Sequence, residues 1–533
     1  MKRQIIVLVA IIVVGAALRM YHLGRTSHGL DPDEVLYAYD GWSIATTGTD
    51  HRQTGHPPLY LKGYSTSWDN RTSILYPYIV AGLFQVLPKT MLIVRLPAAV
   101  MGTLIIVLVF SIGKQLFSDR PEVALLAAGS VAVSPLAITY SRIGHDPIMM
   151  AFFLTAATAA FLKTRQRPAW WLVASACLAV GLYAYQPMKL LAPILAATGV
   201  IFLWPTARRQ IGWILGAGGL AALIAFPLVW TQVAHWATVQ GEFNYINLWH
   251  FSIPWLRILG NASAFLIHFF LFNPPVHLWL LPAVTAGLVI LFHFSRRIFW
   301  LLFMWVLIGV LPVLLTVWFP GSREMRVRAI GLIGPLDLLA AVSLSWLSRR
   351  WSAILMKRGY PFWLSPAGLG FMLLLPTIIM ARLNTLSSND LNFNLGGLDQ
   401  AIAIVSQPVW KNRSVVIVPK EQTEGVYVLW ESKYPPVALQ SASTIWATVN
   451  HDERGSADLP QHFGRFSFCL NRECYQPNDQ ALYIVPAWSL PDRKTVGEFF
   501  LRDGNISWPW KIVDNAQPTV HQKKFGSMQN QDL

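Results

Sequence analysis

Long apolar runs recur along the first 380 residues and are separated by short polar segments. A helix needs about 20 mostly apolar residues to cross a bilayer, so runs of this kind predict membrane-spanning helices. The pattern therefore predicts an α-helical polytopic membrane protein with about eleven spans. The predicted spans are residues 4–18, 96–112, 123–140, 147–162, 170–185, 190–204, 211–230, 276–294, 299–319, 330–347 and 362–380.

Two further apolar runs, 74–87 and 258–272, are too short to classify by length alone. Charge decides between the alternatives, because Lys and Arg collect in short cytoplasmic loops. If the basic clusters share the cytoplasmic side, consecutive clusters are joined by an even number of crossings, and neither run can cross. Both are then expected on the outer surface. The clusters lie at residues 2–3, 114–120, 163–167, 208–209, 296–297 and 349–358.

This parity predicts a cytoplasmic N-terminus and an extracytoplasmic C-terminus. The first span has a basic start like that of a signal peptide, but no clear cleavage site follows Arg19, which favours an uncleaved helix. Residues 19–95 then form a large first extracytoplasmic loop. We expect a transmembrane domain over residues 1–380, in the cell (inner or plasma) membrane.

The tail over residues 381–533 is polar and alternating, which indicates a small extracytoplasmic α/β domain. Residues 414–419, 426–430 and 481–486 are predicted strands, and residues 398–406 a short helix. Cys469 and Cys474 flank a turn-like sequence, so a disulfide between them is predicted if the tail faces an oxidising compartment.

Composition narrows the class of protein further. The chain is 54% hydrophobic and 13% charged, whereas an ordinary soluble domain is about 25% charged. Such a composition excludes disorder and argues against a soluble enzyme. The net charge of +15 would suggest nucleic acid in a polar chain, but in a chain this apolar it indicates cationic loops beside a lipid bilayer and no nucleic-acid partner.

Acidic residues are scarce, and three of them lie beside the membrane on the predicted outer side. Asp33 and Glu34 follow the first span and begin a segment with helical spacing of apolar residues. Asp146 follows Arg142 and His145 in the corner between two spans. Each acid could simply cap a helix. Ionisable residues at the membrane nevertheless indicate a functional site by default.

Several cationic residues also lie on the outer side, against the positive-inside trend. Arg95 begins a span, Lys189 lies in a tight turn between two spans, and Arg326 and Arg328 precede another. Such side chains either extend to lipid headgroups or hold an anionic group such as a lipid phosphate. His56 opens a His-Pro-Pro segment, whose two prolines would hold it in a stiff, extended piece.

These segments, in this order, resemble membrane glycosyltransferases of the GT-C type, in particular the protein O-mannosyltransferase-like group and the lipid A aminoarabinose transferases. The resemblance extends over about residues 1–200 and more loosely to about residue 380. No single motif is specific, but four occur in order on one predicted side. The matching segments are Asp33-Glu34 with Tyr37, His56-Pro57-Pro58-Leu59, residues 95–102 and residues 134–146.

The resemblance implies a GT-C fold and transfer of a sugar from a polyprenyl-phosphate donor to an acceptor hydroxyl or phosphate, with inversion. The acceptor could be a lipid, a glycan or a protein. Asp33 or Glu34 is the candidate base, and Asp146 belongs to the same catalytic group. Cations must stabilise the leaving lipid phosphate. The residues implied in donor and phosphate binding are Tyr37, His56, Arg95, Arg142, Lys189, Arg326 and Arg328.

Two questions stay open at this point. A divalent metal held by Asp33, Glu34 and Asp146 is an alternative to cations alone, although no strict ligand spacing is visible. A polytopic transporter or flippase of envelope precursors, or a non-catalytic envelope-assembly protein, is the alternative from another class. A transporter would place charges at the bilayer midplane, often in repeated halves, and no internal repeat is visible.

Overall fold

The computed structural model describes fifteen stretches of the chain in two compact units. The first unit contains residues 2–24, 33–59, 61–62 and 71–356, and the second contains residues 30–32 and the described part of 397–514. The predicted domain boundary at residue 380 lies outside the described residues. These are 2–24, 30–59, 61–62, 71–234, 254–270, 280–316, 323–356, 397–419, 424–441, 446–451, 455–460, 462–469, 480–486, 495–499 and 510–514.

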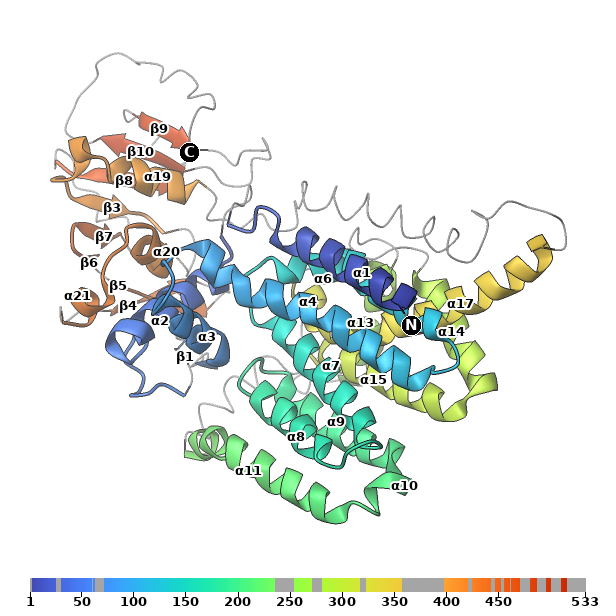
Figure 1. Ribbon diagram of the computed structural model, residues 1–533. Coiled ribbons are helices and arrows are strands. Elements are labelled where there is room, and N and C mark those ends of the chain that lie inside the picture. The colour runs from blue at the N-terminus through green and yellow to red at the C-terminus, as the bar shows by residue number, and fades with distance from the viewer. Residues whose placement is uncertain are drawn as a thin grey trace. The chain divides into compact units, whose positions relative to one another are not determined.

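The first unit is almost entirely helical (Figure 1). Its elements are α1 (Lys2–Met20), α2 (Pro32–Thr47), β1 (Leu61–Lys62), β2 (Arg71–Thr72), α3 (Leu75–Phe84), α4 (Met91–Leu116), α5 (Pro121–Val133), α6 (Pro135–Ser141), α7 (Pro147–Lys163), α8 (Trp170–Gly181), α9 (Met188–Phe202), α10 (Trp204–Ala207), α11 (Ile211–Ala234), α13 (Pro254–Phe270), α14 (Leu280–Phe294), α15 (Arg296–Leu315), α16 (Arg323–Arg328), the 3₁₀ turn Ile330–Leu332 and α17 (Pro335–Met356).

Helix length tests the predicted spans only in part. Among the described residues, α4, α11, α15 and the segment 330–350 are long and apolar enough to cross a membrane. The other predicted spans that are described coincide with shorter apolar helices or with the α5–α6 pair. Helix α3 is about 15 Å long, too short for a hydrocarbon core of about 30 Å. The span predicted at 362–380 lies outside the described residues, and the total of eleven stays a prediction.

The run 123–140, predicted as one span, is broken. Helices α5 and α6 meet at an angle of 54° at Ser134. Pro135 is the first residue of α6, and a residue before proline is driven out of the helical region, as the ψ of 119° at Ser134 shows. The break turns the chain toward the loop that carries Asp146.

Two arginines satisfy the carbonyl groups that these helix ends leave unpaired. Arg19, fully buried near the end of α1, donates to the carbonyl oxygens of Val131 and Ala132 at 2.9 and 3.0 Å. Arg142, just after α6, donates in return to the carbonyls at the end of α1, including that of Tyr21 at 2.7 Å. Arg19 thus caps the end of α5, and Arg142 caps the end of α1.

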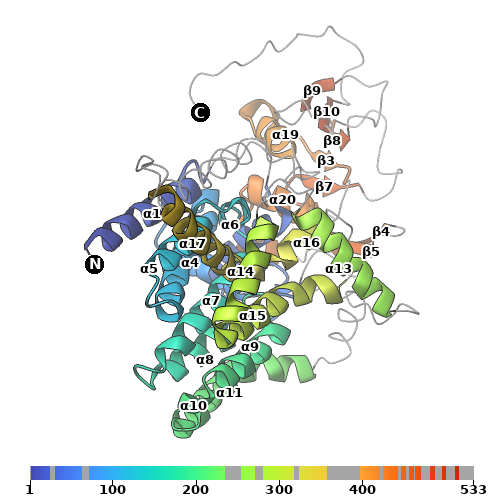
Figure 2. The same ribbon diagram turned by 90° about the vertical axis from the view of Figure 1, so that its right-hand side faces the viewer.

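Helices α14 and α17 lie side by side in Figure 2 and pack closely at Gly287. A Cβ at Gly287 would overlap the backbone carbonyl of Leu339. Backbone cannot move away as a flexible side chain can, so only glycine fits here.

Gly287→Ala should therefore lower the free energy of unfolding by about 1–3 kcal/mol, the usual cost of overpacking. Gly219→Ala on α11 is the matched control, since a Cβ there meets no atom within 4 Å. Thermal denaturation of both variants in one detergent measures the effect. Equal midpoints for the two variants would contradict the close packing.

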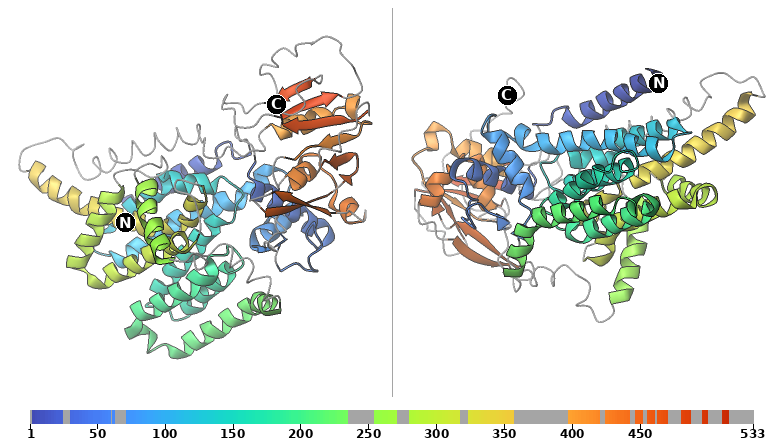
Figure 3. Two further views of the ribbon diagram at one scale, coloured as in Figure 1. Left: turned by 180° about the vertical axis from the view of Figure 1, so that it is seen from behind. Right: turned by 60° about the horizontal axis from the view of Figure 1, so that its bottom comes forward.

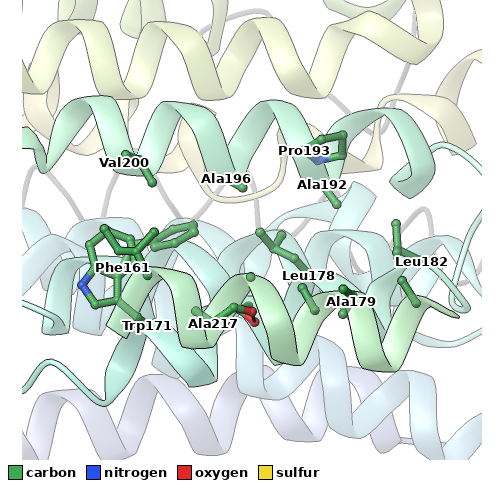
Figure 4. A pocket seen from close by; sticks show the side chains of 16 residues that line it. Phe161, Trp171, Leu178, Ala179, Leu182, Ala192, Pro193, Ala196, Val200 and Ala217 are labelled. Carbon is green, nitrogen blue, oxygen red and sulfur yellow. Dashed lines mark hydrogen bonds between the residues drawn. The ribbon is translucent and has the colours of Figure 1, made fainter. Parts of the chain in front are cut away.

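An apolar groove of about 370 Å³ lies between α8, α9 and α11 (Figure 4). Helix α8 packs against both α9 and α11, and the three are neighbouring green helices in Figure 3. Small side chains such as Ala196 and Ala217 create the space, and Phe161 and Trp171 close one end. Tyr183 binds α11 to the end of α8, because its hydroxyl donates to the carbonyl of Ile224 at 2.8 Å.

The second unit contains a six-stranded mixed sheet in the order β6-β7-β3-β8-β10-β9. Strand β3 pairs in parallel with β7 and β8, and the other neighbours are antiparallel. Its elements are α19 (Leu398–Val405), the 3₁₀ turn Pro408–Trp410, β3 (Val415–Ile417), α20 (Glu424–Glu431), α21 (Pro436–Ser441), the separate hairpin β4 (Trp446–His451) and β5 (Gly455–Pro460), β6 (His462–Phe463), β7 (Phe466–Phe468), β8 (Leu482–Pro486), β9 (Thr495–Phe499) and β10 (Trp510–Asp514).

Most predicted elements of this unit are confirmed, and one is wrong. Residues 398–405, 415–417 and 482–486 form the expected helix and strands. The predicted strand at 426–430 lies instead in helix α20, whose residues 424–430 are all buried. When a short apolar run is buried on every side, it has no alternation of apolar and polar positions that would distinguish a strand from a helix. The predicted Cys469–Cys474 disulfide lies outside the described residues, because Cys474 does.

Candidate functional site

Asp33, His145 and Asp146 form a cluster between the start of α2 and the start of α7. The His145 Nε2 lies 3.0 Å from Asp33 Oδ2 and 3.3 Å from Asp146 Oδ1. His145 and Asp146 are buried, while the Asp33 side chain is one-third exposed. The histidine therefore bridges a buried carboxylate and an accessible one.

The Asp146 side chain does not cap helix α7. Asp146 occupies the N-cap position of α7 but makes no capping hydrogen bond through its side chain. The capping interpretation is therefore wrong for this carboxylate, and its oxygens are available to the cluster.

Tyr37, one turn along α2 from Asp33, completes the cluster. Its side chain makes a hydrogen bond to Asp146. Its ring stacks on that of His145, with centroids 6.3 Å apart, and contacts Tyr76 on the other side at 5.6 Å. Because Tyr76 is anchored by its hydroxyl to the carbonyl of Val94, the histidine plane is fixed by a chain of packed rings.

Glu34 has a different environment from its neighbour Asp33. Its carboxylate accepts two hydrogen bonds from Arg95, at 2.5 and 2.7 Å, and a third from the backbone N–H of Gly144 at 2.7 Å. Glu34 and Arg95 are 1% and 2% exposed. This bidentate pair ties α2 and α4 to the loop that carries His145, so it sets the cluster's geometry.

Arg142, predicted to bind phosphate, is engaged elsewhere. Its Nη1 donates to the carbonyls of Leu18, Arg19 and Tyr21, which holds the loop against the end of α1. The structure therefore gives Arg142 a positioning contact.

Tyr185 connects the cluster to the outer cations. It lies half-buried in the turn between α8 and α9. Its hydroxyl interacts electrostatically with Asp146, Arg328 and Asp33. Tyr185 is thus within electrostatic range of both carboxylates and of one predicted phosphate-binding arginine.

The other predicted cations lie on α9 and α16. Lys189 is half-buried at the second position of α9, four residues after Tyr185. Arg326 is buried in the last turn of α16, two residues before Arg328.

His56 belongs to a separate part of the first loop. It is exposed, and its ring lies beside Gly48. Within the described residues, no hydrogen bond or ion pair joins it to Asp33, His145 or Asp146. The loop is fixed instead by a bond of 2.7 Å between His51 Nδ1 and Asp40 and by Asp50, which accepts from Thr54.

The three predicted acids do not fit a shared metal ion. Glu34 is already bound by Arg95 and Gly144, and His145 lies between Asp33 and Asp146. Within the part of the chain that the structure describes, no group of three or more His, Cys, Asp or Glu side chains is arranged to hold a metal.

Burial makes the cluster sensitive to pH. It raises the pKa of Asp146 to about 7, and the nearby charge of Asp33 adds to the rise while that of His145 opposes it. For His145, burial alone would lower the pKa, but the hydrogen bond that it donates to Asp33 and the charge of Asp146 outweigh burial and raise the pKa. The folded state thus favours a proton on Asp146 and on His145.

Asp146→Asn should therefore gain stability relative to the native chain as pH rises. The unfolded carboxyl titrates near 3.8 and the folded one near 7, so the native chain loses stability through this window, which the neutral amide does not. The measurement is the melting temperature of the variant minus that of the native chain, from pH 4 to pH 8, and this value should rise with pH. A value that falls as pH rises would contradict a protonated Asp146 in the folded state.

Some site residues were not among those predicted. Arg19 and Gly144 act through contacts with chain segments more than 100 residues away, which no local pattern reveals. Tyr185 could have been predicted, because it lies four residues before Lys189 in a tight turn at the predicted outer face.

Comparison with known proteins gives matches at the level of fold and of one family model. The model described as dolichyl-phosphate-mannose-protein mannosyltransferase matches residues 71–230. No curated protein matches the chain.

Two kinds of solved structure have a similar fold. ArnT from Cupriavidus metallidurans, solved with undecaprenyl phosphate, is 12% identical with a TM-score of 0.57, over 97% of this chain and 99% of ArnT. The Archaeoglobus fulgidus oligosaccharyltransferase, solved with a tethered acceptor peptide, is 13% identical with a TM-score of 0.50, over 80% of this chain. The chain spans 63% of that enzyme's length. These likenesses confirm the fold class predicted from the sequence.

Proposed function

We propose that the chain is a membrane glycosyltransferase of the GT-C type and that it transfers a sugar from a polyprenyl-phosphate donor to an acceptor hydroxyl or phosphate at the extracytoplasmic face. The observation that carries the proposal is the accessible Asp33 carboxylate, held by His145 beside a buried acid and within range of outer cations. ArnT, with its bound undecaprenyl phosphate, supports the class of donor.

Asp33, and not Glu34, is the proposed base. A general base must reach the proton that it abstracts, and only Asp33 combines exposure with a free approach to the site. Both oxygens of Glu34 are occupied by Arg95. His145 orients the Asp33 carboxylate. In an inverting transfer Asp33 takes the acceptor's proton as the acceptor oxygen attacks the anomeric carbon and the lipid phosphate leaves.

The leaving phosphate needs positive charge that is already in place. Arg328 is the best-supported group, since its charge is felt at Tyr185 together with those of Asp33 and Asp146. Arg326, in the last turn of α16, and Lys189, at the start of α9, are proposed to assist. Arg95 has its guanidinium on Glu34, so its proposed role changes from phosphate binding to positioning.

The apolar groove between α8, α9 and α11 suits the donor's isoprenoid chain. It is lined by Ala, Leu and Val side chains and reaches Leu182, close to the turn that holds Tyr185 and Lys189. An extended apolar chain bound there would bring its phosphate end toward Lys189.

The proposed topology has a direct test. A reporter fused after Asp390 should be active outside the membrane, and one fused after Arg350 should be active inside, because the basic cluster at 349–358 is assigned to the cytoplasm. Paired reporters that are active only in opposite compartments measure this. Reversed signals would overturn both the parity and the extracytoplasmic placement of residues 381–533.

The function is tested by incubating the purified chain with labelled polyprenyl-phosphate sugars, one donor at a time, and candidate lipid, glycan and peptide acceptors. We expect one donor to be consumed and its sugar to appear on one acceptor class. A transporter would leave every donor intact while moving it between leaflets, which would overturn the proposal.

A further inference from the structure

A second pocket, of about 400 Å³ and lined mainly by polar side chains, lies at the C-terminal ends of α4 and α7. It is formed by the last turns of both helices and the residues that follow α7. Three of its lining side chains are cationic, and no lining residue is acidic. Its polar lining residues include Ser111, Lys114, Gln115, Lys163, Arg165 and Gln166.

The positive charge of this pocket is not neutralised by the described part of the chain. Neither Lys114, Lys163 nor Arg165 forms an ion pair with a described carboxylate. Lys163 lies over the Trp170 ring at 4.5 Å, and Arg165 over the Phe202 ring at 5.4 Å.

A further guanidinium crowds the same place. Arg297 lies over the Phe202 ring at 5.0 Å, and burial together with the charge of Arg297 lowers the pKa of Arg165. Cations held this close repel one another, so an anion between them would be favoured.

The pocket lies across the membrane from the candidate site. Helices α4 and α7 pack together and both begin at the site, where Arg95 and Asp146 stand. At 1.5 Å per residue, Lys114 is about 28 Å from Arg95, and Lys163 is about 25 Å from Asp146. These lengths approach the roughly 30 Å of a bilayer's hydrocarbon core, so the pocket falls at the opposite headgroup layer.

We infer that this pocket binds the phosphate of an anionic phospholipid from the leaflet opposite the candidate site. Basic pockets between membrane helices on the cytoplasmic side suit such headgroups. The shared chemistry is a phosphate anion, which a soluble phosphate could also supply, and the position at headgroup depth favours the lipid. The inference does not depend on the proposed transferase activity.

The test uses the purified full chain in phosphatidylcholine nanodiscs, with phosphatidylglycerol as the probe, and native mass spectrometry to count retained lipid. K114Q/K163Q should weaken phosphatidylglycerol retention by about 25-fold, from about 5-fold for each cation. K114R/K163R should retain it. R208Q/R209Q is the matched control, because both arginines are exposed, lie on the same predicted side and do not line the pocket.

The outcomes separate the sources of phosphate. Native-like retention by K114Q/K163Q, or an equal loss in R208Q/R209Q, would overturn the pocket. Binding of glycerol phosphate or inorganic phosphate to the same lysines as tightly as the lipid would overturn the lipid assignment. If K114R/K163R also loses the lipid while its melting temperature is native, the charges are not the recognised feature and the inference fails.

Discussion

Asp33→Asn should lower the rate of sugar transfer by a factor of about 10²–10⁴, the usual contribution of a general base. The amide keeps the shape and can still contact His145, but it cannot accept the acceptor's proton. Asp33 is one-third exposed, so its replacement should leave the melting temperature close to native. Initial rates at saturating donor and acceptor, with thermal denaturation of the same sample, measure both expectations.

Asp119→Asn provides the control for the loss of one negative charge. Asp119 is exposed in the loop after α4, at the end opposite to the site, and contacts only Ser118 in the described structure. It should transfer sugar at the native rate. Full activity of Asp33→Asn under the same conditions would remove Asp33 from the proposed mechanism.

Glu34→Gln should act mainly on stability. Removing one partner of a buried ion pair leaves the other charge uncompensated, which costs about 3–5 kcal/mol. Here Arg95, 2% exposed, would lose its counter-charge. Thermal denaturation should show a large fall in midpoint, and Arg95→Gln a similar one.

The double variant Glu34→Gln/Arg95→Gln separates this role from catalysis. It removes both charges together, so its loss of stability should be smaller than the sum of the two single losses. A Glu34→Gln variant that loses transfer but keeps native stability would instead identify Glu34 as the base. Comparison with Asp33→Asn therefore assigns the two adjacent acids.

Much of the fold could be predicted because the bilayer imposes a strong pattern on sequence. Helix α7 begins at Pro147, as predicted, and the GT-C fold class with a C-terminal α/β unit is confirmed. The break at Ser134 was missed because the apolar run continues through it, and hydropathy does not register a bend. Helix α20 was missed because burial on all sides removes periodicity.

The sequence identified several residues of the site, but it did not reveal the role of each one. Asp33 and Glu34 are adjacent, so sequence alone treats them alike. On a helix they point about 100° apart, and this sends one toward His145 and the other toward Arg95. Arg142 was assigned to phosphate by its charge, but it caps α1, a partner set by tertiary structure alone.

The central claim is that the sugar leaves the donor while the phosphate stays on the lipid. A donor labelled with tritium in the sugar and with radioactive phosphorus in the phosphate tests it most directly. The proposed mechanism predicts that tritium moves to the acceptor and that all the labelled phosphate is recovered as free polyprenyl phosphate. Transfer of both labels together, or recovery of both in intact donor, would contradict it.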